Sequence, residues 1–416
     1  MNYRILAGLP SPQAVSLGQH LELHGAAPHL GRADGDALLA DLEAAGLRGR
    51  GGAGFPTATK IAAVAGRRRP IVVVNGAEGE PMSSKDRVLL TMVPHLVLDG
   101  ATLAAQAIGA RDCVIAAPAD THTALRAAIR ERRSSRSSVR IKVERSAGGY
   151  VAGEETALIA HLEGRPALPR VKPPLPAERG LNGRPTLVQN AETLAHVALI
   201  ARHGPQWFRE GGRGGVPGTT LVTISGAVDT PGVYEVPAGM ALPEMIEIAG
   251  GPLQRLRALL VGGYFGGWVE GSGQGLSFDD VSLATAGVGT GAGVVVALGG
   301  VDCPVAETAN LAEWLAEESA GQCGPCVFGL AGLGEVLGRV AAGRITSGDG
   351  KRLTRWTEMV RGRGACRHPD GVARMIATAM RVFGPEIHEH ARSGPCPACH
   401  RRRALHTPRG RAAVAA

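Results

Sequence analysis

Hydrophobic positions in the first half of the chain follow two alternating periods, which predicts alternating helices and strands. Short apolar runs rich in valine and isoleucine are typical of buried strands, and longer segments between them repeat apolar residues at helical spacing. Strands are expected at 71–74, 113–116 and 139–143, and helices at 37–45, 88–108 and 121–132. This alternation predicts an α/β unit with a parallel sheet, whose ligand lies at the carboxyl ends of the strands.

The pattern changes from residue 219 onward. Two short alternating runs flank the turn 229–232 and predict a β-hairpin. A short helix and two further strands are expected before residue 300, and amphipathic helices follow it. The expected helices are 242–249, 306–318, 324–342, 352–361 and 371–382, and the expected strands are 221–225, 232–236, 259–262 and 293–297.

Together these patterns divide the chain into consecutive parts. We expect an N-terminal extension (1–34), an α/β domain (35–210), a small β-rich domain (217–300), a helical domain (301–400) and a basic disordered tail (401–416).

Composition narrows the class of protein. The 416 residues include 60 glycines but only 6 Phe, 4 Trp and 4 Tyr. We therefore expect a core of small aliphatic residues, and several places where the backbone closely approaches another group. The net charge of +8 is concentrated in the tail, and no basic face alternates with aromatic residues, which argues against nucleic-acid binding. No apolar run reaches the length of a membrane span and no signal peptide is evident, so we expect a cytoplasmic protein.

Four loops of the α/β unit carry groups that suit a phosphate or a flat ring. They are the glycine loop 49–54 with Lys60 after it, the acidic turn 75–81, the glycine-acid run 148–156 and the polar helix start 185–193. A glycine loop alone is usually a surface turn, and a pair such as Glu154 and Glu155 is usually a solvated face. All four in one α/β unit favour a ligand site.

The residues of these loops resemble a known family. The segments concerned are 48–57 (Arg-Gly-Arg-Gly-Gly-Ala-Gly-Phe-Pro-Thr), 85–87 (Lys-Asp-Arg), 94–95 (Pro-His), 153–158 (Gly-Glu-Glu-Thr-Ala-Leu), 162–165 (Leu-Glu-Gly-Arg), 172–174 (Lys-Pro-Pro) and 190–194 (Asn-Ala-Glu-Thr-Leu). They resemble the NADH-binding flavoprotein subunit of NADH:quinone oxidoreductase (respiratory complex I), a subunit type that also occurs in NAD-linked hydrogenases and formate dehydrogenases. The resemblance implies a Rossmann-like FMN domain, a ubiquitin-like β-grasp domain of the soluble-ligand-binding type, and a helical bundle with a [4Fe–4S] cluster.

The resemblance also implies the site residues. Glu78, Glu154 and Glu155 would orient the nicotinamide and ribose of NADH by hydrogen bonds. The residues expected to bind FMN and NADH are Gly49, Gly51, Gly52, Gly54, Phe55, Lys60, Asn75, Tyr150, Lys172, Asn190 and Thr193. A cation and backbone donors suit the flavin phosphate, and glycine leaves one face of the flavin ring free for the nicotinamide.

The sequence departs from this family near the nicotinamide. Ala77 replaces an aspartate of the acidic turn, Ala63 lies where an aromatic residue is expected after Lys60, and Leu175 replaces another aromatic residue. Each aromatic contact contributes about 1 kcal/mol beyond its buried area. These losses motivate the hypothesis that FMN binds while NADH binds weakly or another donor is used.

Five of the seven cysteines follow residue 320, which points to metal binding rather than disulfides in a cytoplasmic protein. Cys323, Cys326 and Cys366 resemble the family's cluster ligands, whose two-residue spacing lets thiolates bind different irons of one cube. Ala320 replaces the first ligand, which leaves a [4Fe–4S] cluster with another fourth ligand, a [3Fe–4S] cluster, a decayed site or a thioredoxin-like dithiol open. Cys396, Cys399 and His400 are considered as substitute ligands, and Cys113 and Cys303 are expected to be buried small hydrophobic residues.

The resemblance therefore implies an NADH dehydrogenase-type oxidoreductase. It would oxidise NADH through FMN and pass single electrons through an iron–sulfur cluster to a quinone-reductase complex, a ferredoxin or a similar partner, without inserting into the membrane itself. Two alternatives stay open: an FMN and iron–sulfur electron-transfer subunit that does not use NADH, and a scaffold with an empty flavin site. The expected location is cytoplasmic, with a peripheral place on a membrane complex left open.

Overall fold

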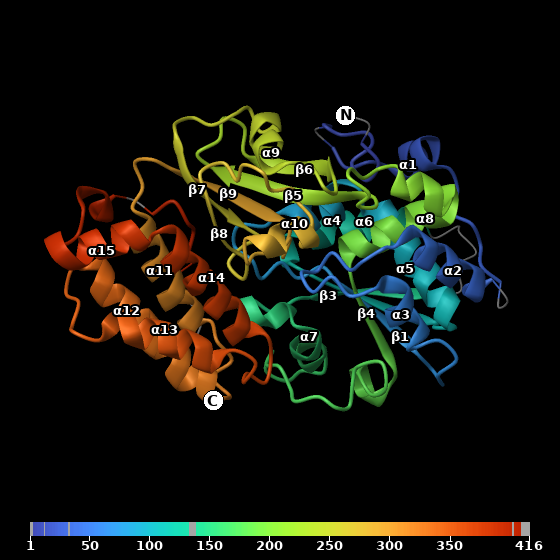
Figure 1. Ribbon diagram of the computed structural model, residues 1–416. Coiled ribbons are helices and arrows are strands. Elements are labelled where there is room, and N and C mark those ends of the chain that lie inside the picture. The colour runs from blue at the N-terminus through green and yellow to red at the C-terminus, as the bar shows by residue number, and fades with distance from the viewer. Residues whose placement is uncertain (1–2, 12, 32–33, 133–138, 402, 409–416) are drawn as a thin grey trace.

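The computed structural model describes residues 3–11, 13–31, 34–132, 139–401 and 403–408 (Figure 1). Along the chain it passes from a parallel α/β unit to a mixed sheet and then to a group of helices at the opposite end of the molecule. This is the fold class that the hydrophobic pattern predicts.

The first sheet has four strands, all parallel, in the order β3-β2-β1-β4. The strands are β1 (Ile71–Asn75), β2 (Asp112–Ala117), β3 (Arg140–Arg145) and β4 (Thr186–Asn190). The first three lie where the apolar runs predict them, whereas the sequence pattern predicts a helix start where β4 lies. Asn75 and Asn190 are register partners at the ends of the adjacent strands β1 and β4, so both reach the same edge of the sheet.

Helices pack on this sheet. They are α2 (Gly35–Ala45), α3 (Thr57–Ala62), α4 (Lys85–Met92), α5 (Pro94–Ile108), α6 (His122–Glu131), α7 (Glu155–Leu162) and α8 (Ala191–Arg209), with short 3-10 turns η1 (Ala119–Thr121), η2 (Tyr150–Gly153) and η3 (Leu181–Gly183). Gly100 lets α5 approach α8 closely, because a Cβ there would lie 1.8 Å from the carbonyl oxygen of Leu194.

The single apolar helix expected at 88–108 is in fact two helices, α4 and α5, that meet at 94°. Pro94 explains the break, because proline disfavours a helical conformation at the preceding residue and lacks the N–H that a continuing helix needs. In the described part of the chain no single helix could cross a membrane. This bent pair meets the requirement by length and composition alone, and most of α5 is buried in the protein core.

The second sheet is five-stranded and mixed, in the order β6-β5-β9-β7-β8. The predicted hairpin is present as β5 and β6, and β9 pairs with β5 in parallel. Its elements are β5 (Thr219–Gly226), β6 (Gly232–Pro237), α9 (Leu242–Ile248), β7 (Leu256–Val261), β8 (Gly267–Glu270), α10 (Asp280–Thr285) and β9 (Val294–Gly299). The sequence pattern does not predict β8 or α10.

The C-terminal part is helical and packs on β8 through α14. Its elements are α11 (Pro304–Glu317), the π-helical turn η4 (Pro325–Leu330), α12 (Ala331–Ala341), α13 (Asp349–Val360), α14 (His368–Val382), α15 (Gly384–Ser393) and the 3-10 turn η5 (Pro397–His400). The basic tail, which the sequence predicts to be disordered, packs against the helices in residues 403–408. There Leu405 is buried, and the Trp314 indole donates to the carbonyl of Pro408 at 2.9 Å. Residues 402 and 409–416 lie outside the described part of the chain.

The N-terminal extension is anchored on helix α5 of the α/β unit and on strand β6 of the mixed sheet. Its helix α1 (Leu17–His24) places His20 2.8 Å from Asp99 of α5. Residues 4–6 lie against β6, where one carboxylate oxygen of Glu235 accepts the backbone N–H groups of Arg4, Ile5 and Leu6 at 2.8, 2.9 and 3.0 Å. Glu235 is 3% exposed, so these bonds form away from water.

We expect Glu235→Ala to lower the free energy of unfolding by about 2–4 kcal/mol, because it leaves several buried N–H groups without an acceptor. Urea unfolding would measure the change. Glu244→Ala is the matched control, since Glu244 pairs with Arg213 on the surface and its loss should cost less than about 1 kcal/mol. Equal effects of the two substitutions would contradict this role for Glu235.

Candidate functional site at the carboxyl edge of the parallel sheet

The ends of β1 and β4 hold two asparagines that organise the loops above them. Asn75 donates its amide to the carbonyl of Gly153 at 2.8 Å and accepts the N–H of Ala77 at 3.1 Å. Asn190 caps α8 by accepting the N–H of Glu192 at 3.0 Å. The acidic turn, the glycine-acid run and the start of α8 therefore meet at one sheet edge, as the sequence predicts.

The glycine loop lies against the start of α8. It is closed at its base, where the N–H of Gly49 donates to Phe55 at 2.9 Å, and the backbone N–H of Arg50 donates to the Thr193 hydroxyl at 2.9 Å. A Cβ at Gly51 would lie 3.4 Å from the Cβ of Asn190, and Gly52 has a φ of +101°, which favours glycine. The loop thus brings bare backbone to the strand ends, which suits a phosphate or a flat ring.

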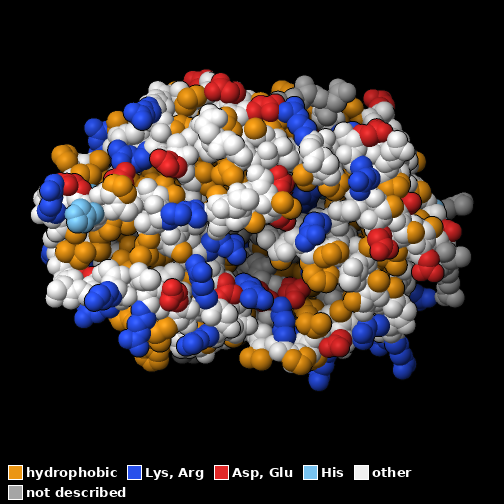
Figure 2. Space-filling model, viewed as in Figure 1, with side chains coloured by type: hydrophobic (Ala, Val, Ile, Leu, Met, Phe, Trp, Pro, Cys, Tyr) orange, Lys and Arg blue, Asp and Glu red, His pale blue; other side chains and the backbone are white. Residues whose placement is uncertain are grey.

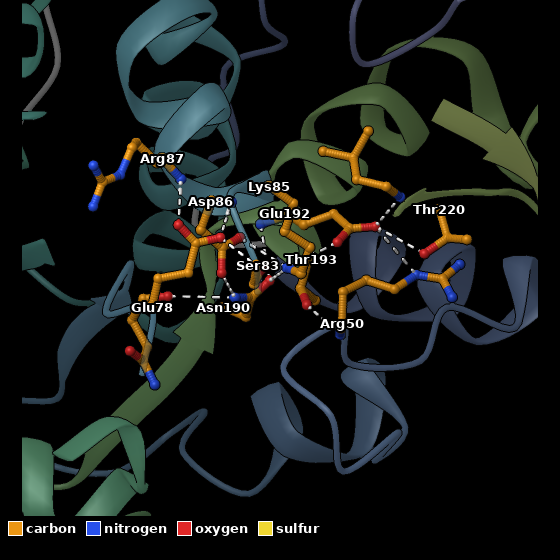
Figure 3. A network of polar contacts seen from close by, with 12 residues as sticks. Arg50, Glu78, Ser83, Lys85, Asp86, Arg87, Asn190, Glu192, Thr193 and Thr220 are labelled. Carbon is orange, nitrogen blue, oxygen red and sulfur yellow. Dashed lines mark hydrogen bonds and ion pairs between the residues drawn. The ribbon is translucent and has the colours of Figure 1, made fainter. Parts of the chain in front are cut away.

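Beneath the loop lies a buried ionic network that joins two of the motifs (Figure 3). Lys85 lies 2.9 Å from Asp86 and 3.0 Å from Glu192, and the three residues are 3%, 4% and 0% exposed. Burial lowers the pKa of Lys85, but the two carboxylates raise it more, so the cation is retained. Asp86 also accepts the amide of Asn190 at 2.7 Å, and Glu192 accepts the N–H of Leu221 at 2.9 Å.

Sequence reasoning assigns no role to Lys85, Asp86 or Glu192, although all three lie within the motifs that carry the resemblance. The available signal is the presence of three charged residues beside strongly apolar helical segments.

Glu78 accepts hydrogen bonds from residues that follow it closely in the chain. Its carboxylate accepts the Ser83 hydroxyl at 2.7 Å and the backbone N–H groups of Asp86 and Arg87 at 2.9 and 3.2 Å. It therefore satisfies the first free N–H groups of α4. This geometry makes Glu78 a residue that positions the acidic turn against the ionic network.

Glu154 and Glu155 form a charged cluster with two lysines. Glu154 caps α7 by accepting the N–H groups of Thr156 and Ala157 at 2.7 and 3.1 Å. Glu155 lies 3.2 Å from Lys60 and 2.7 Å from Lys172. Burial alone would raise the pKa of Glu155, but Lys60 and Lys172 lower it by more, so the carboxylate stays ionised. The structure thus brings four of the predicted site residues together at a partly exposed position; Figure 2 shows acidic and basic side chains side by side near the middle of this face.

Tyr150 lies in one of the four loops 49–54, 75–81, 148–156 and 185–193, which we call the flavin-type loops. It connects them to the mixed sheet and to the C-terminal helices. Its hydroxyl donates to Glu80 at 3.0 Å, its backbone N–H donates to Glu318 at 2.8 Å, and its ring centre lies 4.5 Å from that of Phe265. Glu80 also accepts the backbone N–H of Tyr264 at 2.8 Å. Sequence reasoning misses Glu80 and Glu318, because their partners are 70 or more residues away in the chain.

The three predicted cluster cysteines also converge. Cys326 is buried in η4, and burial together with the nearby thiols of Cys323 and Cys366 raises its pKa to about 12. The backbone of Ala365, next to Cys366, hydrogen-bonds to Cys323. Glu318, which contacts Tyr150, lies five residues before Cys323. Three neighbouring thiols offer three ligands for an iron–sulfur cluster.

Comparison with known families agrees with this arrangement. The Nuo51 FMN-binding domain matches residues 42–199, the SLBB domain matches 221–263, and the NADH-ubiquinone oxidoreductase-F iron-sulfur binding region matches 306–390. The matches therefore cover the glycine loop, the strand ends and the three convergent thiols.

Relatives match over most of the chain. The NADH-quinone oxidoreductase F 2 subunit of Rhizobium meliloti (strain 1021) is 36% identical, covering 88% of this chain and 92% of the relative. The corresponding F protein of Streptomyces coelicolor is 34% identical over 87% of this chain and 84% of its own length. The NAD⁺-reducing [NiFe]-hydrogenase, solved in the air-oxidised state, superimposes with a TM-score of 0.79 at 35% identity. That match covers 86% of this chain and 63% of the hydrogenase chain. The chain belongs to the family of NADH-quinone oxidoreductase F subunits.

Proposed function

We propose that this chain is the electron-entry flavoprotein of a multisubunit oxidoreductase, oxidising NADH at FMN and delivering single electrons to an iron–sulfur cluster. The observation that carries the proposal is the convergence of the glycine loop, both strand-end asparagines and the Glu155–Lys172 cluster at the sheet edge matched by the FMN-binding family. Bound FMN supplies the hydride-accepting chemistry and the change from two-electron to one-electron transfer.

The residues of this chain would hold the flavin and the nucleotide in distinct ways. The glycine loop and Thr193 would offer backbone to the flavin, Asn75 and Asn190 would orient it at the strand ends, and Lys60 with Lys172 would supply positive charge for phosphate groups. Glu154, Glu155 and Phe55 would contact the nucleotide. Glu78 would act indirectly, by fixing the position of the acidic turn. Tyr150 would link the flavin-type loops to Glu318, which precedes the cluster cysteines in the chain.

Cys323, Cys326 and Cys366 would bind the cluster. Ala320 stands where a fourth cysteine is expected by resemblance, so we propose a cluster with three protein thiolates. Partner subunits would carry the acceptor site, and a cytoplasmic location at the periphery of such an assembly is part of the proposal.

Anaerobic titration of the FMN-loaded chain with NADH tests this function. We expect the visible flavin absorbance to bleach at micromolar NADH. Flavin that dithionite reduces but NADH does not would favour the alternative electron-transfer subunit with another donor. A purified chain that retains no FMN after reconstitution would favour the scaffold.

Phe55 offers a test of the nucleotide site. Its ring is 51% exposed beside the glycine loop, where it is available for stacking. We expect Phe55→Ala to raise the KM for NADH roughly five- to tenfold, because one stacking contact contributes about 1 kcal/mol beyond its buried area. Steady-state kinetics with ferricyanide would measure it. Phe328→Ala is the control, since Phe328 is 78% exposed on η4 and should leave the KM unchanged. An unchanged KM in Phe55→Ala would remove Phe55 from the nucleotide site.

A further inference from the structure

Three cysteines and one histidine gather at the far end of the helical part, away from the flavin-type loops. Cys303 precedes α11, His390 lies in the last turn of α15, Cys396 immediately precedes the turn η5, and Cys399 lies within it. Their ligand atoms all lie within 4.8 Å of one another. The family match to the iron–sulfur region covers 306–390, so three of these four residues lie outside it.

The distances fit one tetrahedral metal ion. The Cys399 sulfur lies 3.4 Å from that of Cys303 and 3.7 Å from that of Cys396, and the His390 Nε2 lies 3.6 Å from Cys303 and 3.9 Å from Cys399. With zinc–sulfur bonds of about 2.3 Å and a zinc–nitrogen bond of about 2.0 Å, tetrahedral geometry places neighbouring ligand atoms about 3.5–3.8 Å apart. The observed separations lie around these values.

We propose that Cys303, His390, Cys396 and Cys399 bind a structural zinc ion. A Cys₃His set fills all four positions of a tetrahedral site, which is typical of structural rather than catalytic zinc. Cys303 and His390 are 2% and 3% exposed, so these two ligands would shield their side of the ion from solvent. Cys396 and Cys399 are separated by two residues and joined by an N–H to carbonyl bond of 3.0 Å, a spacing common in zinc-binding turns.

This group is separate from the cluster thiols. Cys303 and Cys323 lie beyond opposite ends of α11, whose 14 residues span about 21 Å. Cys399 is 3.4 Å from Cys303, so neither it nor its neighbours Cys396 and His400 can complete the cluster at Cys323, an arrangement that the sequence alone leaves open. An iron–sulfur cube would also hold its thiolates farther apart, because each thiolate binds a different iron.

The zinc ion would fasten the end of the chain across α11. After η5, the N–H groups of Ala404 and Leu405 donate to Glu307 at 3.0 and 3.1 Å, and Tyr264 donates its hydroxyl to the carbonyl of His406 at 2.6 Å. The segment therefore bridges α11 and the mixed sheet. Its position depends on η5, which the four ligands would hold in place.

Metal analysis of the intact purified chain, expressed without a histidine tag, tests the proposal. We expect one zinc per chain in addition to iron, and zinc-edge X-ray absorption that reports three sulfur neighbours and one nitrogen. Cys399→Ser should lose zinc and retain iron, whereas Cys326→Ser should lose iron and retain zinc. Cys113→Ser, which alters a buried thiol of β2, should retain both.

Trypsin supplies a second readout through Arg401 and Arg403. Removing zinc with a chelator should raise the cleavage rate there about tenfold or more, because the segment opens more often. Absence of stoichiometric zinc, iron in its place, or zinc retained in Cys399→Ser would overturn the proposal. If a variant fails to fold, the zinc content and X-ray absorption of the wild-type chain decide the question.

Discussion

Replacing Lys85 with methionine is expected to lower the free energy of unfolding by about 3–5 kcal/mol, because it leaves buried Asp86 without its cation and Glu192 with only the Arg50 guanidinium, 4.0 Å away. Asp86 and Glu192 lie 2.9 and 3.0 Å from the ammonium group and are both buried. Methionine matches the length of the lysine stem, so packing changes little. Urea unfolding monitored by circular dichroism would measure the loss.

The same substitution is expected to release FMN. Asp86 accepts the Asn190 amide at 2.7 Å, and Glu192 lies in the first turn of α8, where the adjacent Thr193 accepts the glycine-loop N–H of Arg50. A displaced carboxylate would therefore move both the strand end and the loop. Flavin content after gel filtration, measured by fluorescence, should fall at least about tenfold, since 1.4 kcal/mol of lost binding energy is already a factor of ten.

Two controls separate the network from a general effect of losing a lysine. Lys351→Met alters an exposed lysine of α13 and should change stability by less than about 0.5 kcal/mol. The double variant Lys85→Met with Glu192→Gln should recover part of the loss, because one of the two buried carboxylate charges that Lys85 neutralised is removed. A Lys85→Met chain with wild-type stability and full FMN content would show that this network does not support the flavin site.

The sequence predicts most of the fold because its periodicities are local. The strands β1 to β3 and the hairpin of β5 and β6 are short runs between clear turns, and α2 ends at Gly46 with a φ of +69°. β4 is hidden in the sequence because its polar end, Gln189 and Asn190, leads directly into the N-terminus of α8. The bend at Pro94 is hidden because both sides of it are apolar.

The candidate site also has a part that the sequence predicts and a part that it does not. The glycine loop, the asparagines at the strand ends and the convergent cysteines lie in recognisable segments, and the structure brings each set together. The links between the parts are long-range, such as Tyr150 with Glu318 or Cys303 with Cys399, and no local pattern contains them. The sequence predicts Cys303 as a simple buried residue, which burial alone supports. Its neighbours become visible only when α15 and η5 fold back onto the start of α11.

The stability of the contact between the three parts is expected to fall as pH rises through about 7. Glu80 is 8% exposed, and burial raises its pKa to about 7, against hydrogen bonds from Tyr264, Tyr150 and Met82 that lower it. A pKa that is higher in the folded chain than in the unfolded one means that the folded state binds the proton more tightly. The stabilisation is therefore complete below about pH 4.5 and is lost as pH rises through about 7.

Glu80→Gln should remove this dependence while keeping the shape of the side chain. Its amide oxygen can still accept the Tyr264 N–H and the Tyr150 hydroxyl, which lie 2.8 and 3.0 Å from the Glu80 carboxylate. Between pH 6 and pH 8, the free energy of unfolding of the wild type should fall about 1.3 kcal/mol more than that of the variant, from one group whose pKa shifts to about 7. Urea unfolding at both pH values measures this difference.

Glu335→Gln is the matched control for Glu80, because Glu335 pairs with Arg339 on the surface and should leave the pH dependence unchanged. Parallel pH profiles for the wild type and Glu80→Gln would show that Glu80 is already ionised in the folded chain at pH 6. A steeper fall in the wild type alone would identify Glu80 as the group through which pH acts on the junction of Tyr150, Tyr264 and the flavin loops.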